Sequence, residues 1–409
     1  MRSIRFNTAE LAGSLGDLGI FLPIAAALIV TNHLNATSVL VAAGLLYIFS
    51  GLYFRVPVPV QPLKATAAIA LATGASASSI SAAAIVMGAI MMFLAFTGAG
   101  KLIARCFNIP VVRGIQLSLG IVLLQNGWQR VVDPKLFTGD AASILSIGGL
   151  NIPVGILLAA ISGLILLALY RSRKIPASVA VLLFGVAAGA LFGSLGRLHD
   201  LSWGPSLGFS LPTAEDFRFA LLVLVLPQIP LTFGNSILAT ADVAKKYFGG
   251  EAERVRPASL CASLGLANLL GGLAGAMPMC HGSGGLTAHY RFGARTGGAT
   301  IFLGGVLLVL ALTLGSSATA VLGLIPLPVL GLMLLFVGAQ HTWLISDLWP
   351  RKSGLALALA VAITSTVTGT LIWGLLLGLL IGSIKALISR IAAIKGRTSE
   401  KEQLETVDI

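Results

Sequence analysis

The sequence is short of charge. Asp, Glu, Lys and Arg make up only 10% of its 409 residues, whereas hydrophobic residues make up 56%. A soluble protein of this length needs far more charge to cover its surface. The long apolar runs also differ from the short alternating segments of membrane β-barrels. The composition therefore predicts an all-α polytopic membrane protein that is surrounded by the lipid bilayer.

Cysteine is equally scarce. Cys106, Cys261 and Cys280 are odd in number and widely spaced, so they indicate neither a disulfide framework nor a CxxC metal site. The chain also lacks the clustered Asp residues that would hold Mg²⁺ for prenyl or phosphoryl transfer. It has no HExxH motif and no paired carboxylates for intramembrane proteolysis. The sequence therefore predicts no metal site, no cofactor and no enzymatic activity.

Apolar segments follow one another along the whole chain, separated by short breaks that carry turn residues or charge. A helix needs about 20 apolar residues to span a bilayer. We predict fourteen membrane segments, near residues 11–30, 36–53, 56–72, 79–98, 108–126, 151–170, 176–194, 217–240, 256–275, 277–296, 298–315, 318–338, 354–369 and 371–389.

The positive charge is distributed unevenly between the two sides. Lys and Arg number 27 against 15 Asp and Glu, which gives a formal net charge of +12. If the N-terminus is cytoplasmic and every segment crosses, only Arg130, Lys135, Arg197 and Arg218 lie outside, and Lys64 alone lies within a segment. This asymmetry follows the positive-inside rule and does not indicate nucleic-acid binding. It predicts a multi-pass protein of the cell (inner) membrane with both termini in the cytoplasm.

Fourteen segments divide into two sets of seven, and an odd-numbered unit must insert its second copy inverted. We predict one transport domain over residues 1–409, with repeats at about 8–195 and 217–390 and a short cytoplasmic tail at 396–409. Segments three and ten, Val56–Ala72 and Met277–Gly297, share an unusual pattern of alternating residues around proline, followed by a short helix. Interrupted segments at equivalent places indicate the binding site of a transporter.

The prolines define where each half-helix should begin. Alternating proline favours an extended strand, so we expect a short strand over Val56–Val60 and extended chain over Met277–Met279. One half-helix should start near Gln61 and the other around His281–Gly284, with their N-termini facing each other. Helix N-termini carry unsatisfied N–H groups and partial positive charge, and they bind anions.

The residues at the start of the second half-helix suit an oxyanion. Gly282 and Gly284 let backbone N–H groups approach a ligand closely. Ser283 and His281 can add hydrogen-bond donors. His281 can alternatively titrate near neutral pH and couple protons. Cys280 has no partner for thiolate chemistry and is expected to pack against its neighbours or make a soft contact.

Lys64 indicates the sign of the ligand. A cation in the first turn of a helix opposes the helix dipole, and an anion bound there would relieve this cost. The alternative is that Lys64 snorkels or pairs with Asp17 or Asp242. Asp17 is then either a coupling site for a proton or cation or a structural ion-pair partner. Asn235 and Gln228 are candidate liners of the site or helix–helix contacts.

The remaining polar residues of these segments are expected to have no part in the site. We expect His289, Arg291 and Arg295 at the cytoplasmic end as topology anchors. We expect His33, His199 and His341 in loops.

Four stretches together resemble the molybdate transporter family, a branch related to the sulfate permeases. They are GSLGDLGIFLPI at 13–24, PVPVQPLKATAAIA at 57–70, LPQIPLTFGNSILATADVA at 226–244 and MPMCHGSGGLTAHYRFGARTGGA at 277–299. The resemblance covers nearly the whole chain. One departure is Leu63, where we expect Met.

The resemblance implies secondary active uptake of molybdate, a tetrahedral dianion, by an elevator-type mechanism. Segments 1–4 and 8–11 would form a core, and segments 5–7 and 12–14 a gate. It implies no STAS domain, and Gln61, Lys64, Cys280, His281 and the nearby glycines as the motif positions. A homodimer is one possible oligomeric state.

Alternative functions share this fold. Sulfate and tungstate are also tetrahedral dianions, and residue types do not distinguish them from molybdate. A passive anion channel is a further alternative. A nucleobase permease would need a carboxylate on segments eight and ten, and only Asp242, near the cytoplasmic end of segment eight, is present.

Overall fold

A computed structural model describes residues 3–98, 108–137, 141–147, 150–172, 175–198, 204–209, 211–315 and 317–384. The predicted tail at 396–409, together with Cys106 and His199, lies outside these residues. The first half of the chain contains α1 (Thr8–Ser14), α2 (Leu18–Asn32), α3 (Ala36–Phe54), β1 (Gln61–Pro62), α4 (Lys64–Thr73), α5 (Ala77–Thr97), α7 (Ile109–Val132), β2 (Ile144–Ile147), β3 (Leu150–Pro153), α8 (Val154–Leu169) and α9 (Ala177–Leu191).

The second half also places one short strand directly before a short helix. It contains α10 (Ala214–Phe219), α11 (Ile229–Leu231), α12 (Thr240–Phe248), α13 (Pro257–Leu273), β4 (Met279–Cys280), α14 (Ser283–Arg291), α15 (Gly298–Leu314), α16 (Ser317–Leu322), α17 (Leu327–Trp343) and α18 (Lys352–Thr368). A further apolar helix covers Leu371–Ile384. Between α10 and α12 the backbone forms two π-helical stretches, Ala220–Val225 and Thr232–Ala239, which flank Pro227 and Pro230.

Most predicted segments coincide with helical chain or with a strand followed by a helix, but the segment predicted at 318–338 is divided between α16 and α17. Six helical stretches are long and apolar enough to cross a membrane, namely Thr8–Asn32, Ala36–Phe54, Ala77–Thr97, Ile109–Val132, Ala214–Ala252 and Leu327–Leu348. The prediction of a polytopic α-helical membrane protein is therefore confirmed. The number of crossings stays a prediction. The segment pattern did not anticipate the hairpin of β2 and β3, in which Ile144 pairs with Pro153.

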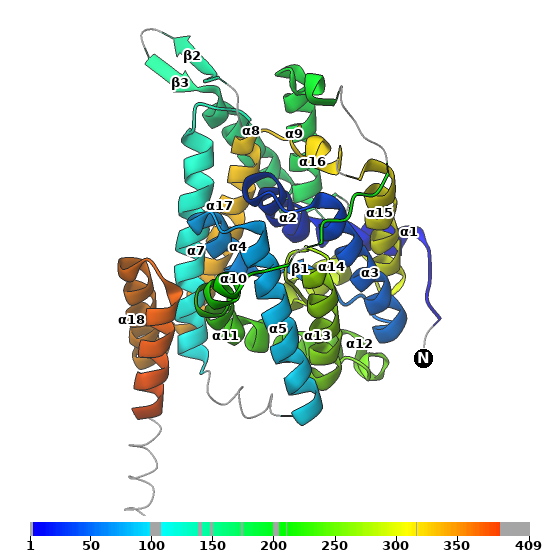
Figure 1. The fold of residues 1–409 in the computed structure, drawn as a ribbon, viewed down its shortest axis with the longest axis vertical. Helices are drawn as coiled ribbons and strands as arrows, with labels where there is room; N and C mark the ends of the chain where they lie inside the picture. The colour runs from blue at the N-terminus through cyan, green and yellow to red at the C-terminus, as the bar shows by residue number, and fades with distance from the viewer. Residues whose placement is uncertain are drawn as a thin grey trace, which may run out of the picture.

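Helix contacts divide the described chain into two groups. In the first group α3 packs against α15, α5 packs against α13, and β1 pairs with β4. In the second group α7 packs against α17 and α18, and α8 packs against α9 and α17. Figure 1 shows α7, α17 and α18 on the left and α3 and α15 on the right, with β1 and α14 between them.

The contacts are symmetric between the two halves of the chain. In this comparison each of the first seven segments is matched with the segment seven places later, so that α3 corresponds to α13 and α5 to α15. The α3–α15 contact then corresponds to the α5–α13 contact. The α7–α18 contact is likewise exchanged with α8–α17. Two repeats of seven segments with inverted topology would produce this exchange.

Glycines seven residues apart allow the long helices to pack closely. A Cβ atom on Gly51 would lie 2.4 Å from the carbonyl oxygen of Gly297, and one on Gly304 would lie 2.5 Å from that of Gly44. Small residues are the usual means of close helix packing in membranes. The same arrangement joins α7 to α17, through Gly120, Gly127, Gly331 and Gly338.

Candidate functional site

Two very short strands hold the interrupted segments together at the centre of the bundle (Figure 1). β1 pairs antiparallel with β4, so that Gln61 lies opposite Cys280 and Pro62 lies opposite Met279. Each strand leads into a short helix, α4 or α14, which we call the half-helices. Segments three and ten, far apart in the sequence, therefore meet at one place.

The strand before α4 does not lie where the sequence predicted it. We expected Val56–Val60, whereas the paired residues are Gln61 and Pro62. Pro57 and Pro59 have no N–H to donate to a ladder. Side chains satisfy the carbonyl groups of this stretch instead. Ser50 Oγ donates to Val58 at 2.6 Å, the Tyr47 hydroxyl lies 2.6 Å from the oxygen of Val60, and His281 Nδ1 lies 2.8 Å from that of Pro59.

The half-helices begin without a side-chain cap of their own. α14 begins at Ser283, inside the predicted range, and α4 begins at Lys64, three residues after the predicted start near Gln61. The N–H groups of Ala65 and Thr66 donate to Gln228 Oε1, at 2.8 and 3.3 Å. A glutamine from segment eight thus caps α4.

A small, partly open cavity lies at the start of the half-helices, with a volume of about 20 Å³. It is lined by Lys64, Gln116, Gln228, Leu231, Asn235, Ser236, Cys280 and His341. Asn235 and Ser236 come from the π-helical stretch Thr232–Ala239. Such stretches are frequent at functional sites. The sequence analysis named Lys64, Gln228, Asn235 and Cys280, but it missed Gln116, Ser236 and His341.

The lining is cationic and rich in hydrogen-bond donors. The ammonium group of Lys64 makes no hydrogen bond or ion pair with a described residue. Ser283 Oγ donates to Asn235 Oδ1 at 2.7 Å, and Arg113 donates to Gln116 Oε1 at 2.7 Å. The amide nitrogens of Asn235 and Gln116 keep their donors for other partners. No carboxylate is among the described residues that line the cavity.

Two histidines differ from what the sequence predicted for them. His341 belongs to α17 and not to a loop, and its Nδ1 donates to the carbonyl of Val337 at 2.9 Å. His289 was expected at the cytoplasmic end, but it is completely buried and its Nδ1 donates to the carbonyl of Gly13 at 2.8 Å. The loop prediction for His341 is wrong. The side of the membrane predicted for His289 stays a prediction, but its burial does not fit a surface anchor, because a single sequence does not show which face of a helix packs inward.

His281 supports the site from behind. Its ring is completely buried and lies edge-on to Phe54. The carbonyl of Pro59 can only accept, so Nδ1 carries a proton, and Nε2 lies 2.8 Å from the hydroxyl of Ser263. Both ring nitrogens therefore have protein partners. His281 fixes β4 to the proline-rich stretch and does not line the cavity.

Gln61 and Asp17 fill the space that two glycines leave open. A Cβ on Gly282 would lie 2.4 Å from Gln61 Oε1, and one on Gly285 would lie 2.4 Å from Asp17 Oδ1. Gly284, in contrast, faces open space, with no atom within 4 Å of its Cβ position. The glycine run therefore lets Gln61 and Asp17 pack directly against the start of α14.

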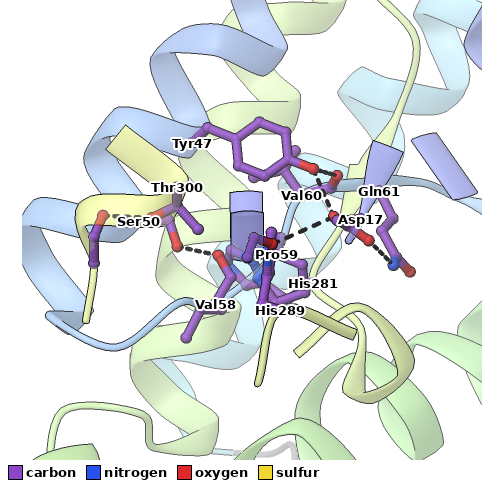
Figure 2. Close-up of polar contacts among 12 residues, drawn as sticks. Asp17, Tyr47, Ser50, Val58, Pro59, Val60, Gln61, His281, His289 and Thr300 are labelled. Carbon is purple, nitrogen blue, oxygen red and sulfur yellow. Dashed lines mark hydrogen bonds and ion pairs between the residues drawn. The ribbon is translucent and has the colours of Figure 1, made fainter. Parts of the chain in front are cut away.

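Asp17 lies at the centre of a buried polar cluster. Figure 2 shows Tyr47, Gln61 and His289 converging on its carboxylate. The Tyr47 hydroxyl lies 2.5 Å from Oδ2, Gln61 Nε2 donates to Oδ1 at 2.5 Å, and His289 Nε2 lies 3.9 Å from Oδ2. The sequence predicted Asp17 or Asp242 as an ion-pair partner of Lys64. Asp17 contacts His289 instead, and no ion pair between Lys64 and Asp242 occurs among the described residues.

Comparison with known proteins identifies the family. The family model described as "Molybdate transporter of MFS superfamily" matches residues 9–123 and 220–340, which include both half-helices. This chain belongs to the molybdate transporter family. It is similar to Molybdate transporter 2 of Arabidopsis thaliana, with 31% identity over 83% of this chain and 79% of that protein. It is also 30% identical to Molybdate transporter 1 of Chlamydomonas reinhardtii, over 81% of this chain and 82% of the relative.

Solved structures of anion transporters share the fold of this molybdate transporter family member. The transmembrane domain of the cyanobacterial bicarbonate transporter BicA matches with a TM-score of 0.67 and 20% identity, over 92% of this chain and 98% of that domain. Murine Slc26a9 in the inward-facing state matches with a TM-score of 0.68 and 17% identity, over 95% of this chain and 70% of the other. The family and the apolar helices together identify a multi-pass membrane protein of a transporter family, not of an enzyme family.

Proposed function

We propose that the protein takes up molybdate by secondary active transport and holds the anion in the cavity between the two half-helices. The observation that carries this proposal is the ammonium group of Lys64, which has no hydrogen bond or ion pair with a described residue and lines a cavity to which no described carboxylate contributes. An uncompensated cation inside the membrane is costly, and a dianion would offset that cost. The named molybdate transporters among the relatives favour molybdate over sulfate as the substrate.

The proposed contacts fall into two groups. Lys64, Asn235, Cys280 and the start of α14 at Ser283 and Gly284 would face the anion. Gln61, His281 and Gly282 would hold these groups in place, because each of them packs against the strand pair or the start of α14. Gln116 and His341, from α7 and α17, would complete the wall on the other side.

The size of the cavity indicates that anion binding requires movement. A volume of about 20 Å³ is enough for roughly one water molecule. A tetrahedral oxyanion is larger than water, so the walls must separate when it enters. The cavity lies between the first helix group, which supplies Lys64 and Cys280, and the second, which supplies Gln116 and His341. Relative motion of the two groups, as in an elevator, would open it.

The predicted topology belongs to the same proposal. We infer an inner-membrane protein with cytoplasmic termini, built as a single domain from repeats at about 8–195 and 217–390. The exchange of helix contacts between the halves supports the repeats. A homodimer stays a prediction.

Uptake by the purified full-length protein in proteoliposomes tests the proposal. Radioactive molybdate should accumulate above its external concentration when an ion gradient is imposed, whereas a passive channel would only equilibrate it. Excess unlabelled tungstate and sulfate measure selectivity, and liposomes without protein give the background. If sulfate accumulates and molybdate competes only weakly with it, sulfate and not molybdate is the substrate. Absence of both activities would overturn the proposal.

A further inference from the structure

The cluster around Asp17 has more acceptors than protons. Asp17, Tyr47, Gln61 and His289 are all completely buried, so their polar atoms depend mainly on partners from the protein. The Tyr47 hydroxyl lies 2.6 Å from the carbonyl oxygen of Val60 and 2.5 Å from Asp17 Oδ2. A carbonyl only accepts, and a tyrosine has one proton to donate. When that proton is on the bond to Val60, the contact with Asp17 requires a proton from Asp17.

His289 presents the same deficit on the other side of the carboxylate. Its Nδ1 donates to the carbonyl of Gly13, so in the neutral ring Nε2 is an acceptor. That atom is buried, has no hydrogen-bond partner among the described residues and lies 3.9 Å from Asp17 Oδ2. Two acceptors facing each other in a dry site are unfavourable. One additional proton on either group would relieve the conflict (Figure 2).

The surrounding charges connect this proton to the anion. Lys64 and Cys280, which both line the cavity, interact electrostatically with Asp17, and so do Tyr47 on α3 and His289 on α14. Lys64 and Asp17 carry opposite charges on neighbouring elements. A dianion beside Lys64 would add negative charge close to the Asp17 carboxylate, and a proton bound at the Asp17–His289 pair would offset that charge.

We propose that the Asp17–His289 pair is the binding site of a coupling proton, which binds together with the anion and crosses the membrane with it. This inference rests on the transport function proposed above. By linkage, a proton that promotes anion binding is itself bound more tightly when the anion is present. The result is symport of a proton and an oxyanion, and Gln61 lies between the two sites, bonded to Asp17 Oδ1 and paired in the strand ladder with Cys280 of the cavity.

Uptake of radioactive molybdate into proteoliposomes at external pH 5.5 and 7.5, with the interior at pH 7.5, tests the inference. If only the protonated Asp17–His289 pair allows molybdate to bind, the apparent affinity for molybdate is proportional to the protonated fraction of the pair. The affinity then changes by up to about tenfold per pH unit. The wild-type ratio of initial rates, at molybdate concentrations below saturation, should be about tenfold or more. A pH dye trapped inside should record acidification that depends on molybdate.

The variants Asp17→Asn and His289→Gln identify the site. An asparagine amide can donate to Tyr47 as a protonated carboxyl would, so the rate ratio should fall to about one. His289→Gln should also lower the rate ratio toward one. The ratio is internal to each variant and does not depend on how much protein is active. Asp216→Asn is the matched control, because Asp216 accepts from serines at the start of α5 and lies outside the cluster.

The outcomes separate this inference from the transport function. If the wild type accumulates molybdate but shows neither a pH ratio nor internal acidification, the proton site is refuted and the transport function stands. If both variants keep the wild-type ratio, the proton binds elsewhere and the assignment is wrong. If the wild type transports no oxyanion at all, the transport proposal itself has failed. If Asp17→Asn transports nothing, the pH ratio of the His289→Gln variant decides: a ratio near one supports the proton site, and the wild-type ratio refutes it.

Discussion

Replacement of Lys64 by methionine tests the anion site most directly. Methionine is similar in length to lysine and is flexible and apolar, so it should fill the same space without the charge. At about 4 Å and an effective dielectric constant of about 20, each pair of unit charges contributes about 4 kcal/mol, and a dianion therefore gains about 8 kcal/mol before desolvation. Desolvation offsets much of this gain, and breaking a buried ion pair typically costs about 3–5 kcal/mol.

These magnitudes predict opposite effects on binding and on stability. A loss of about 3 kcal/mol weakens molybdate binding by roughly 150-fold. Without substrate, however, Lys64→Met removes a cation that has no described ion-pair partner, so the variant should unfold at a higher temperature than the wild type. Molybdate at 100 times its dissociation constant should stabilise the wild type by about 2.7 kcal/mol, and the same concentration should hardly affect the variant.

Thermal unfolding in detergent, with and without molybdate, measures both effects in one experiment. Initial rates of uptake in proteoliposomes then report the change in KM. Lys245→Met, on the exposed surface of α12, is the matched control and should respond to molybdate as the wild type does. A Lys64→Met variant that keeps the wild-type shift in unfolding temperature would refute the reasoning, because the charge would then contribute nothing to binding.

Two further predictions concern packing and capping. Gly51→Ala places a Cβ 2.4 Å from the carbonyl of Gly297 and should lower the unfolding temperature and the yield of folded protein; Gly305→Ala, on the open face of α15, should leave both unchanged. Equal behaviour of the two variants would contradict the close packing of α3 on α15. Gln228→Leu leaves the N–H groups of Ala65 and Thr66 without their acceptor and should cost about 1–2 kcal/mol in unfolding free energy. An unchanged unfolding temperature would show that water or another side chain caps α4.

The sequence was sufficient for the architecture because the relevant signals are local. Apolar length, charge asymmetry and alternating proline each depend on neighbouring residues, and they located both half-helices to within a few residues. The position of β1 was wrong because side chains from other segments bond to the carbonyls of Val58, Pro59 and Val60, so that stretch does not pair with another strand. The glycines spaced by seven on α3, α7, α15 and α17 were visible in the sequence and would have predicted the close helix pairs.

The residues that close the site could not be found in this way. Gln116 and His341 lie on helices of the second group, and no local pattern indicates that they face Lys64. His289 looked like one of three basic residues at a helix end, and only the packing of α14 against α1 brings it to Asp17. Contacts of this kind depend on helix rotation and on pairing between distant segments, which a single sequence does not specify.

The glycine run of α14 shows how the two proposed sites share one wall. From the sequence alone, its glycines would let backbone N–H groups approach an anion. In the structure, Gly282 and Gly285 leave room for Gln61 and Asp17, and the next residue along from Gly282, Ser283, bonds to Asn235 at the cavity. A proton on Asp17 and an anion beside Lys64 would therefore act on opposite sides of the same turn of α14. Coupling between them needs no long pathway, because a change in charge on either side acts directly on the other across Gln61.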